Sequence, residues 1–343
     1  MEAQRTPKTK ALVLNSPQNP SGLVFSRAEL TAIVNWAVEH DVLVIADEIY
    51  EKLLYNGNEF TSVLELDDAN MDHVVLINGV SKAYSMTGWR IGYAAGPQTI
   101  MAKMGVVLGH AASNPAAVSQ YAAIEAFSGD QSSVETMRQG FEARLNELYP
   151  LIERLPGFKM PAGKPAGAFY LFPDITEALR LTGYADAPAF VTAVLLEAHV
   201  GLVPGEAFGM PGCLRLSYAT DIDSLREAHR RLQKFMTEKI AEQAKYPLIE
   251  RLHGFKMPAG KPAGAFYLFP DITEALRLTG YADAPAFVTA VLLEAHVGLV
   301  PGEAFGMPGC LRLSYATDID SLREAHRRLQ KFMTEKIAEQ AIP

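Results

Sequence analysis

The segment SKAYSMTGWRIGY, residues 81–93, gathers several side chains that could take part in chemistry. Lys82 stands beside Ser81, and Arg90 follows a few residues later. An unprotonated lysine amine adds to carbonyl carbons, and a guanidinium binds phosphate or carboxylate through two parallel hydrogen bonds. A lone lysine is more often a solvated surface residue. A role for Lys82 therefore depends on the elements that position it.

Three short apolar runs precede three polar clusters. The runs 11–15, 42–46 and 73–77 have strand length, and the segment 26–40 between the first two is amphipathic, with Ser26 and Glu29 spaced as a capping box. Strand, helix, strand is typical of a parallel sheet, in which ligands gather beyond the carboxyl ends of the strands. The polar clusters at those ends are NSPQNPSG (15–22), ADEIY (46–50) and NGVSK (78–82). We therefore expect Lys82 to lie where the three strand ends converge.

The second half of the chain is a repeat. Residues 149–244 return as 246–341, with a single difference, Pro156 against His253. The unit is domain-sized, unlike the shorter repeats of solenoids, and we expect strands at AFYLF, VGLVP and CLRLSYA and helices near 188–198 and 223–241 in its first copy. Before it, the patterns predict a strand at 91–96. They also predict helices at 97–110, 115–128 and 131–154.

The predicted fold class is α/β, with a truncated, mostly parallel sheet and crossover helices followed by two copies of a small α+β domain. The predicted domains are residues 1–148, 149–245 and 246–343.

Composition narrows the possible functions. The net charge of −8 gives no reason to expect nucleic acid as a partner, and 49% hydrophobic content is typical of a globular protein. The start has no apolar stretch of signal-peptide length, and no apolar run is long enough to span a membrane, so we expect a cytoplasmic protein. Cys213 and Cys310 occupy equivalent places in the repeat, which suggests neither a disulfide framework nor a metal site.

The motifs NSPQNPSG, DEIYEKLLY, SKAYSMTGWRIGYAAG and LRLSYA, in this order over residues 7–244, resemble the class I/II pyridoxal-phosphate aminotransferases, in particular the bacterial aspartate and broad-specificity branch. The resemblance implies that Lys82 forms an internal aldimine with pyridoxal 5'-phosphate and then moves a proton on the substrate as base and acid. It implies that amino acids and 2-oxo acids are the substrates and that the protein is a homodimer.

The resemblance also assigns the remaining site residues. Asp47 matches the carboxylate that keeps the ring nitrogen of the cofactor protonated, and Asn19 and Tyr50 match the hydrogen-bond donors to its 3′-oxygen. Arg90 matches the phosphate-binding arginine, with Ser81 as a weaker candidate for the same phosphate.

Two further residues of the Lys82 segment have structural interpretations. Gly88 is interpreted as a close backbone approach and Trp89 as a core aromatic.

Arg215, in LRLSYA, matches the residue that binds the substrate α-carboxylate, and Arg312 is its duplicate. We favour Arg215, because the helices of residues 97–154 deliver the first copy in the usual order.

Relative to the family, we expect the amino-terminal arm, the first strands, the turn that holds the phosphate and the stacking aromatic to be missing. The sequence thus leaves two readings open, an aminotransferase and a catalytically inactive remnant of a truncated, duplicated gene or faulty gene model that acts at most by association. A carbon–sulfur lyase is a poorer third, since DEIH would be expected where the chain has DEIY.

Overall fold

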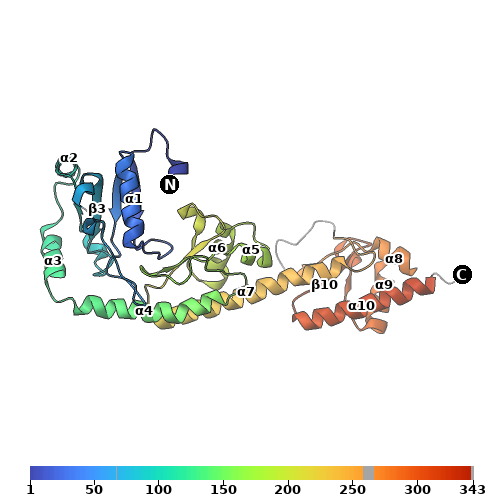
Figure 1. Ribbon diagram of the computed structural model, residues 1–343. Helices are drawn as coiled ribbons and strands as arrows, with labels where there is room; N and C mark the ends of the chain where they lie inside the picture. Colours follow the sequence, from blue (N-terminus) through green and yellow to red (C-terminus); the bar gives the residue numbers. More distant parts are fainter. Residues whose placement is uncertain (67, 258–265, 341–343) are drawn as a thin grey trace. The chain divides into compact units, whose positions relative to one another are not determined.

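The computed structural model describes residues 1–66, 68–257 and 266–340 (Figure 1). The chain forms two compact units. The first comprises Met1–Arg180 and Tyr184–Phe235, and the second comprises Leu181–Gly183 and the chain from Met236 onward. Helix α7 (Ile222–Glu250) contributes to both. The division into three domains that the sequence suggests remains a prediction.

A four-stranded sheet lies at the start of the first unit. Its strands are β1 (Ala11–Asn15), β2 (Leu43–Asp47), β3 (Val74–Gly79) and β4 (Gly92–Ala95), in the order β1-β2-β3-β4. The pairs β1–β2 and β2–β3 are parallel, and β3–β4 is antiparallel. The four predicted strands are therefore confirmed within one or two residues, and the carboxyl ends of β1, β2 and β3 meet at one edge of the sheet.

Helix α1 (Arg27–Glu39) covers one face of this sheet (Figure 1). It begins with the predicted capping box, in which Ser26 and Glu29 each accept a hydrogen bond from the backbone of the other. Leu30, Val34 and Ala37 then face the sheet and are buried against alternate strand residues such as Val44. Val13, which points to the opposite face of β1, is 70% exposed.

Three further helices follow, as predicted: α2 (Gln98–Ala111), α3 (Ala117–Ser128) and α4 (Ser132–Glu153). Only α4 has an extensive buried face. Helices α2 and α3 instead present several exposed apolar side chains: Met104, Val106, Val107, Leu108, Val118, Tyr121, Ile124 and Phe127.

The first copy of the repeat folds as a small antiparallel sheet with helices. Its strands are β5 (Tyr170–Leu171), β6 (Val203–Pro204) and β7 (Leu214–Ser217), in the order β5-β7-β6. The strands lie where they were predicted but are shorter. The helix predicted near 188–198 is α6 (Ala187–Ala193) continued by a π-helical turn (Val194–Ala198), and α5 (Thr176–Thr182) was not predicted.

The second copy repeats these elements in the second unit. Its strands are β8 (Tyr267–Leu268), β9 (Val300–Pro301) and β10 (Leu311–Ser314), and its core includes Phe287 and Phe332. Its helices are α8 (Thr273–Thr279), α9 (Ala284–Ala290) with a π-helical turn (Val291–Ala295), and α10 (Ile319–Gln340). Short 3-10 helices in the chain are Glu2–Gln4, Val63–Glu65, Asp68–His73, Thr87–Trp89, Gly205–Phe208 and Gly302–Phe305.

Helix α7 is longer than the sequence pattern predicts. The prediction ends it near residue 241, whereas it continues to Glu250. The reason is that residues 246–250 repeat residues 149–153, which form the last turn of α4, so two helical sequences follow each other without a break. Within the described ranges, no helix has both the length and the apolar character needed to cross a membrane.

Candidate functional site

The loop after β1 is attached to the end of β2 by the side chain of Asn15. Its amide nitrogen donates to the carbonyl oxygen of Asp47 at 3.0 Å, and its amide oxygen accepts from the backbone N–H of Asn19 at 2.7 Å. The carboxylate of Asp47 accepts from the backbone N–H of Ile49 at 3.1 Å. Because β1 and β2 are parallel and Asn15 pairs with Asp47, the two polar segments are fixed side by side.

Tyr50 follows Asp47 and is almost completely buried. Its hydroxyl group lies 3.0 Å from that of Tyr170, on β5. Burial raises the pKa of Tyr50 well above its usual range, and the hydrogen bond to Tyr170 and the negative charge of Asp47 act in the same direction. Tyr50 is thus a neutral phenol that can donate a hydrogen bond.

Lys82 lies after β3, against an aromatic wall. Its Nζ is 6.0 Å from the ring centre of Tyr50 and 5.8 Å from that of Phe169. Phe169 and Tyr170 belong to the first copy of the repeat, so the amine lies where this copy meets the strand ends of the sheet. The predicted proximity of Lys82 to the DEIY segment is therefore present.

Arg90 lies at the edge of this arrangement. The Thr87 hydroxyl donates to the Ser81 carbonyl at 2.9 Å, and the Arg90 guanidinium donates to the Thr87 carbonyl at 2.9 Å. These two bonds fold the loop back onto the residue that precedes Lys82. Arg90 itself is exposed and has a left-handed backbone with φ of 54°.

The interpretations of Gly88 and Trp89 are wrong. A Cβ added to Gly88 would meet nothing within 4 Å, so no close backbone approach requires a glycine. Trp89 is 43% exposed and is not part of a core. Both residues lie in the short helix Thr87–Trp89, which has no buried residue because it runs along the surface of the unit.

Arg215, on β7, reaches the loop after β1. Its Nη1 donates to the side-chain oxygen of Asn19 at 2.9 Å, and its guanidinium carbon lies 4.5 Å from the ring centre of Tyr170 and 4.9 Å from that of Phe208. The guanidinium is thus held between two aromatic rings, with part of its donor fork directed at Asn19.

Arg312 repeats the aromatic part of this arrangement. In the second unit its guanidinium carbon lies 4.4 Å from the ring centre of Tyr267 and 4.8 Å from that of Phe305. The structure thus unites Asn19, Asp47, Tyr50, Ser81, Lys82 and Arg215 in one unit, with Arg90 on its rim. The chemical roles assigned to these residues remain predictions.

Four residues around the site are not predicted by the sequence patterns, namely Asn15, Phe169, Tyr170 and Phe208. A signal for Tyr170 was available, because AFYLF and LRLSYA are neighbouring strands and Tyr170 pairs with Ser217, close to Arg215. Asn15 could have been found from the register of two parallel strands that end in Asn and Asp. Phe208 lies in a 3-10 helix that no periodic pattern announces.

Comparison with known proteins identifies a family that this chain matches. The family described as aminotransferase class I and II matches residues 1–232 and 224–329. An asparagine–oxo-acid transaminase of Streptococcus mutans is 51% identical over 236 residues, which are 69% of this chain and 60% of that protein. An aspartate aminotransferase of Bacillus sp. (strain YM-2) is 50% identical over 231 residues, 67% of this chain and 58% of that protein.

Solved structures show the same relationship. The crystal structure of an aromatic aminotransferase from Pyrococcus horikoshii OT3 has a TM-score of 0.64 at 37% identity, covering 69% of this chain and 62% of that one. The chain spans about three fifths of the length of the curated relatives it matches. Since the family match extends over well over half of its residues, the chain belongs to the aminotransferase class I and II family.

Proposed function

We propose that this protein is a pyridoxal-phosphate-dependent aminotransferase that transfers an amino group between an amino acid and a 2-oxo acid, with Lys82 as the reactive amine. The observation that carries the proposal is the meeting of Lys82, Tyr50 and Arg215 around the Phe169–Tyr170 segment in one unit. Family membership supports it, and the relatives named above are aminotransferases.

The side chains present fit the cofactor. Pyridoxal phosphate has an aldehyde, a phenolic oxygen, a ring nitrogen and a phosphate, and the chain offers an amine, two neutral donors, a carboxylate and a guanidinium. The amine is Lys82, the neutral donors are Tyr50 and Asn19, the carboxylate is Asp47 and the guanidinium is Arg90, with Ser81 as a second phosphate ligand. When bound, the cofactor supplies a carbonyl carbon for amines and a ring that accepts electrons.

Each residue then has a stated task. The Asp47 carboxylate holds a proton on the ring nitrogen, and Tyr50, kept neutral by its burial, donates a hydrogen bond to the phenolic oxygen. Arg215 binds the substrate carboxylate, since its guanidinium is already oriented by two aromatic rings. Lys82, as a free amine, takes the proton from the substrate α-carbon and delivers it again.

Two features of the molecule belong to the same proposal. Residues 246–343 are inferred to be a second copy of the small domain, supported by the repeated elements and by the near-identity of sequence. A homodimer is supported by the exposed apolar side chains of α2 and α3, because an apolar patch of this kind favours association.

The test uses the full chain and pyridoxal phosphate. We expect a visible absorbance band on mixing, and reduction with borohydride should attach the cofactor irreversibly to the peptide that contains Lys82, as identified by mass spectrometry. Lys82→Ala should abolish both signals. Lys52→Ala is the matched control, since Lys52 lies in the neighbouring segment and pairs only loosely with Glu51 at 4.0 Å.

Amino-group transfer would then be measured with aspartate or an aromatic amino acid as the donor and 2-oxoglutarate as the acceptor. Labelling of Lys82 together with transfer supports the proposal in full. A wild-type chain without the band, or with labelling spread equally over other lysines, would contradict it and would favour a catalytically inactive remnant.

A further inference from the structure

Tyr170 of β5 connects two residues that the proposed function uses separately. Its hydroxyl group lies 3.0 Å from that of Tyr50, and the two rings are nearly perpendicular, with centres 6.1 Å apart. Its ring centre lies 4.5 Å from the guanidinium carbon of Arg215. One side chain thus contacts both the tyrosine assigned to the phenolic oxygen of the cofactor and the arginine assigned to the substrate carboxylate.

The strand pairing places Tyr170 beside Arg215. Tyr170 pairs with Ser217 across β5 and β7, and Arg215 lies two residues before Ser217. Side chains two residues apart on a strand point to the same face of a sheet, so the ring and the guanidinium meet on one face. Phe208 adds a second ring, whose centre is 4.9 Å from the guanidinium carbon. The directions in which the guanidinium can point are therefore limited.

Both hydroxyl groups of the tyrosine pair are withdrawn from water. Tyr50 is 3% exposed and Tyr170 is 6% exposed. A buried hydroxyl group that loses its hydrogen-bond partner costs free energy. The two tyrosines therefore keep their hydrogen bond unless another partner replaces it.

The direction of this hydrogen bond in the working site follows from the number of protons. A phenol has one proton to donate, and its oxygen can accept at the same time. If Tyr50 donates to the phenolic oxygen of the cofactor, it has no proton left for Tyr170. The hydroxyl group of Tyr170 is then the donor and the oxygen of Tyr50 the acceptor. A hydroxyl group that accepts a hydrogen bond becomes a better donor, so the two bonds strengthen each other.

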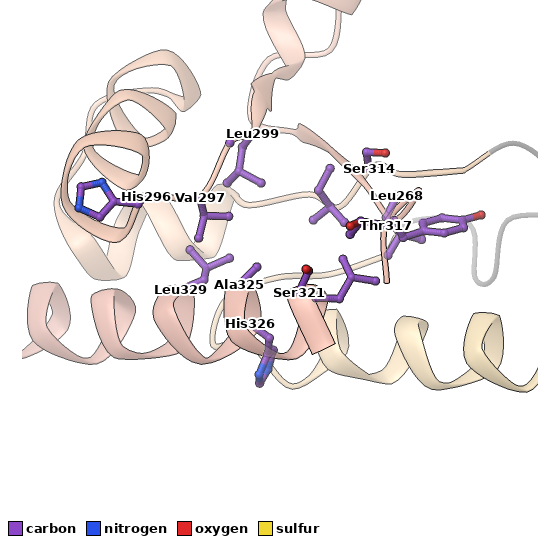
Figure 2. A pocket seen from close by; sticks show the side chains of 14 residues that line it. Leu268, His296, Val297, Leu299, Ser314, Thr317, Ser321, Ala325, His326 and Leu329 are labelled. Carbon is purple, nitrogen blue, oxygen red and sulfur yellow. The ribbon is translucent and has the colours of Figure 1, made fainter. Parts of the chain in front are cut away.

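The second copy repeats the ring contact in other surroundings. Tyr267 pairs with Ser314 across β8 and β10, and the guanidinium carbon of Arg312 lies 4.4 Å from its ring centre. Figure 2 shows Ser314 beside a cavity of this unit, and the described residues that line the cavity belong to the second copy itself. Tyr50 belongs to the first unit. Tyr267 is therefore a control residue with the same local sequence as Tyr170.

We propose that Tyr170 is a positioning residue of the aminotransferase site, which acts on the cofactor through Tyr50 and on the substrate carboxylate through Arg215. Its hydroxyl group donates to Tyr50 and strengthens the hydrogen bond that Tyr50 gives to the phenolic oxygen. Its ring holds the guanidinium of Arg215 in place. This inference rests on the proposed function.

The first test is the pH dependence of the absorbance band of the cofactor-loaded chain. A donor to the phenolic oxygen stabilises negative charge there and disfavours uptake of a proton beside it, so the donor lowers the midpoint pH at which the band changes. Tyr170→Phe removes the hydroxyl group and keeps the ring. It should raise the midpoint by about half a unit or more, whereas Tyr267→Phe should leave the midpoint unchanged.

The second test separates the ring from the hydroxyl group. Tyr170→Leu should weaken the binding of succinate by the cofactor-loaded chain about threefold or more, measured by isothermal titration, because the guanidinium of Arg215 loses an aromatic contact. Tyr170→Phe keeps that contact and should change the affinity by less than about twofold. Tyr267→Leu is the matched control and should have no effect.

A third measurement needs no cofactor. Tyr170→Phe should lower the urea midpoint of the cofactor-free chain, followed by tryptophan fluorescence, because Tyr50 loses its hydrogen-bond partner. The same substitution should not lower the midpoint in a Tyr50→Phe background, in which that hydrogen bond is already absent. Equal lowering in both backgrounds would show that the two hydroxyl groups are not coupled, and would overturn the inference.

The outcomes distinguish this inference from the proposed function. A wild-type chain without the absorbance band contradicts the proposed function and the role of Tyr170 together. A wild-type chain with the band contradicts the role of Tyr170 alone if Tyr170→Phe leaves the midpoint pH unchanged, or if Tyr170→Leu leaves the succinate affinity unchanged. An equal shift of the midpoint in Tyr267→Phe also overturns the inference, because the effect would then not depend on Tyr50.

Discussion

Arg215 and Arg312 have the same sequence around them and the same two aromatic neighbours, but different polar surroundings. Arg215 donates to Asn19, a residue of the loop after β1, at 2.9 Å. Arg312 lies in the unit that contains no strand of the four-stranded sheet. An arginine and its local sequence therefore do not define a binding site by themselves. The segment that packs against the arginine determines whether a site forms.

This difference predicts the result of a matched pair of substitutions. Arg215→Ala should weaken the binding of a substrate carboxylate about tenfold to a hundredfold, since a charge-assisted bidentate interaction is lost. Arg312→Ala should have no effect. The measurement is isothermal titration of the cofactor-loaded chain with a dicarboxylate. Equal losses in the two variants would contradict the assignment of Arg215.

Glu48 is a buried carboxyl that the proposed chemistry does not use. It accepts hydrogen bonds from the Ser62 hydroxyl at 2.7 Å and the Val63 backbone N–H at 2.8 Å. Burial nevertheless raises its pKa from 4.5 to about 7, with smaller contributions from the charges of Glu51 and Glu65. At pH values between 4.5 and about 7, Glu48 is therefore protonated in the folded chain and ionised in the unfolded chain.

Stability should therefore fall as the pH rises through this window. The loss attributable to Glu48 is about 3 kcal/mol at most, fully present above a pH of about 7 and absent below about 4.5. Glu48→Gln should reduce the pH dependence by this amount in urea unfolding followed by tryptophan fluorescence. The exposed Glu59→Gln serves as control, and an unchanged slope in Glu48→Gln would refute the argument.

At the scale of elements, periodicity and capping predicted most of the fold correctly. The strands of the first sheet are apolar runs that end in polar residues, and α1 begins at a capping box that was visible in the sequence. The proximity of Lys82 to Tyr50 followed from parallel topology alone.

Other features depend on tertiary contacts and left no local signal. Tyr170 forms part of the site because two strands of the repeat pair across a sheet, and Phe208 because a 3-10 helix turns it toward Arg215. The prediction that Trp89 is a core residue is wrong because it rests on the usual burial of aromatic side chains. The short helix Thr87–Trp89 instead lies on the surface. The length of α7 was underestimated because the join between two repeats is itself helical.

The capping box of α1 leads to a prediction for that element. Ser26 accepts a hydrogen bond from the Glu29 backbone N–H, and Ser26→Ala should cost about 1 kcal/mol of unfolding free energy because that donor loses its partner. Trp36 lies within α1, so its fluorescence during urea unfolding reports the change. Thr31→Ala on the same helix should change the free energy by less than about 0.5 kcal/mol. Equal losses of unfolding free energy in the two variants would show that the capping hydrogen bond does not contribute the expected stability.

At the scale of the whole molecule, the two repeated stretches of sequence, 149–244 and 246–341, lie for the most part in different units. The first copy packs with the four-stranded sheet in a single unit, and the second has a core of its own that includes Phe287, Phe332 and Leu329. Both tryptophans of the chain, Trp36 and Trp89, belong to the first unit. Tryptophan fluorescence therefore reports the unfolding of the first unit alone, while circular dichroism reports both.

This arrangement allows the two copies to be perturbed separately with one substitution. Phe235 packs against Tyr184 and Phe190, and Phe332 packs in the same way against Tyr281 and Phe287. Either residue changed to alanine should destabilise its own unit by about 3–5 kcal/mol, because a buried aromatic side chain is replaced by a cavity.

Phe235→Ala should move the tryptophan-fluorescence transition to a lower urea concentration. Phe332→Ala should leave that transition unchanged, and circular dichroism should then show the second unit unfolding at a lower urea concentration than the first. The two variants control for each other, since the side chain removed and its neighbours are the same. If the fluorescence transition moved equally in both variants, the two units would unfold as one cooperative structure. The helix α7 would then couple their unfolding, because it belongs to both units.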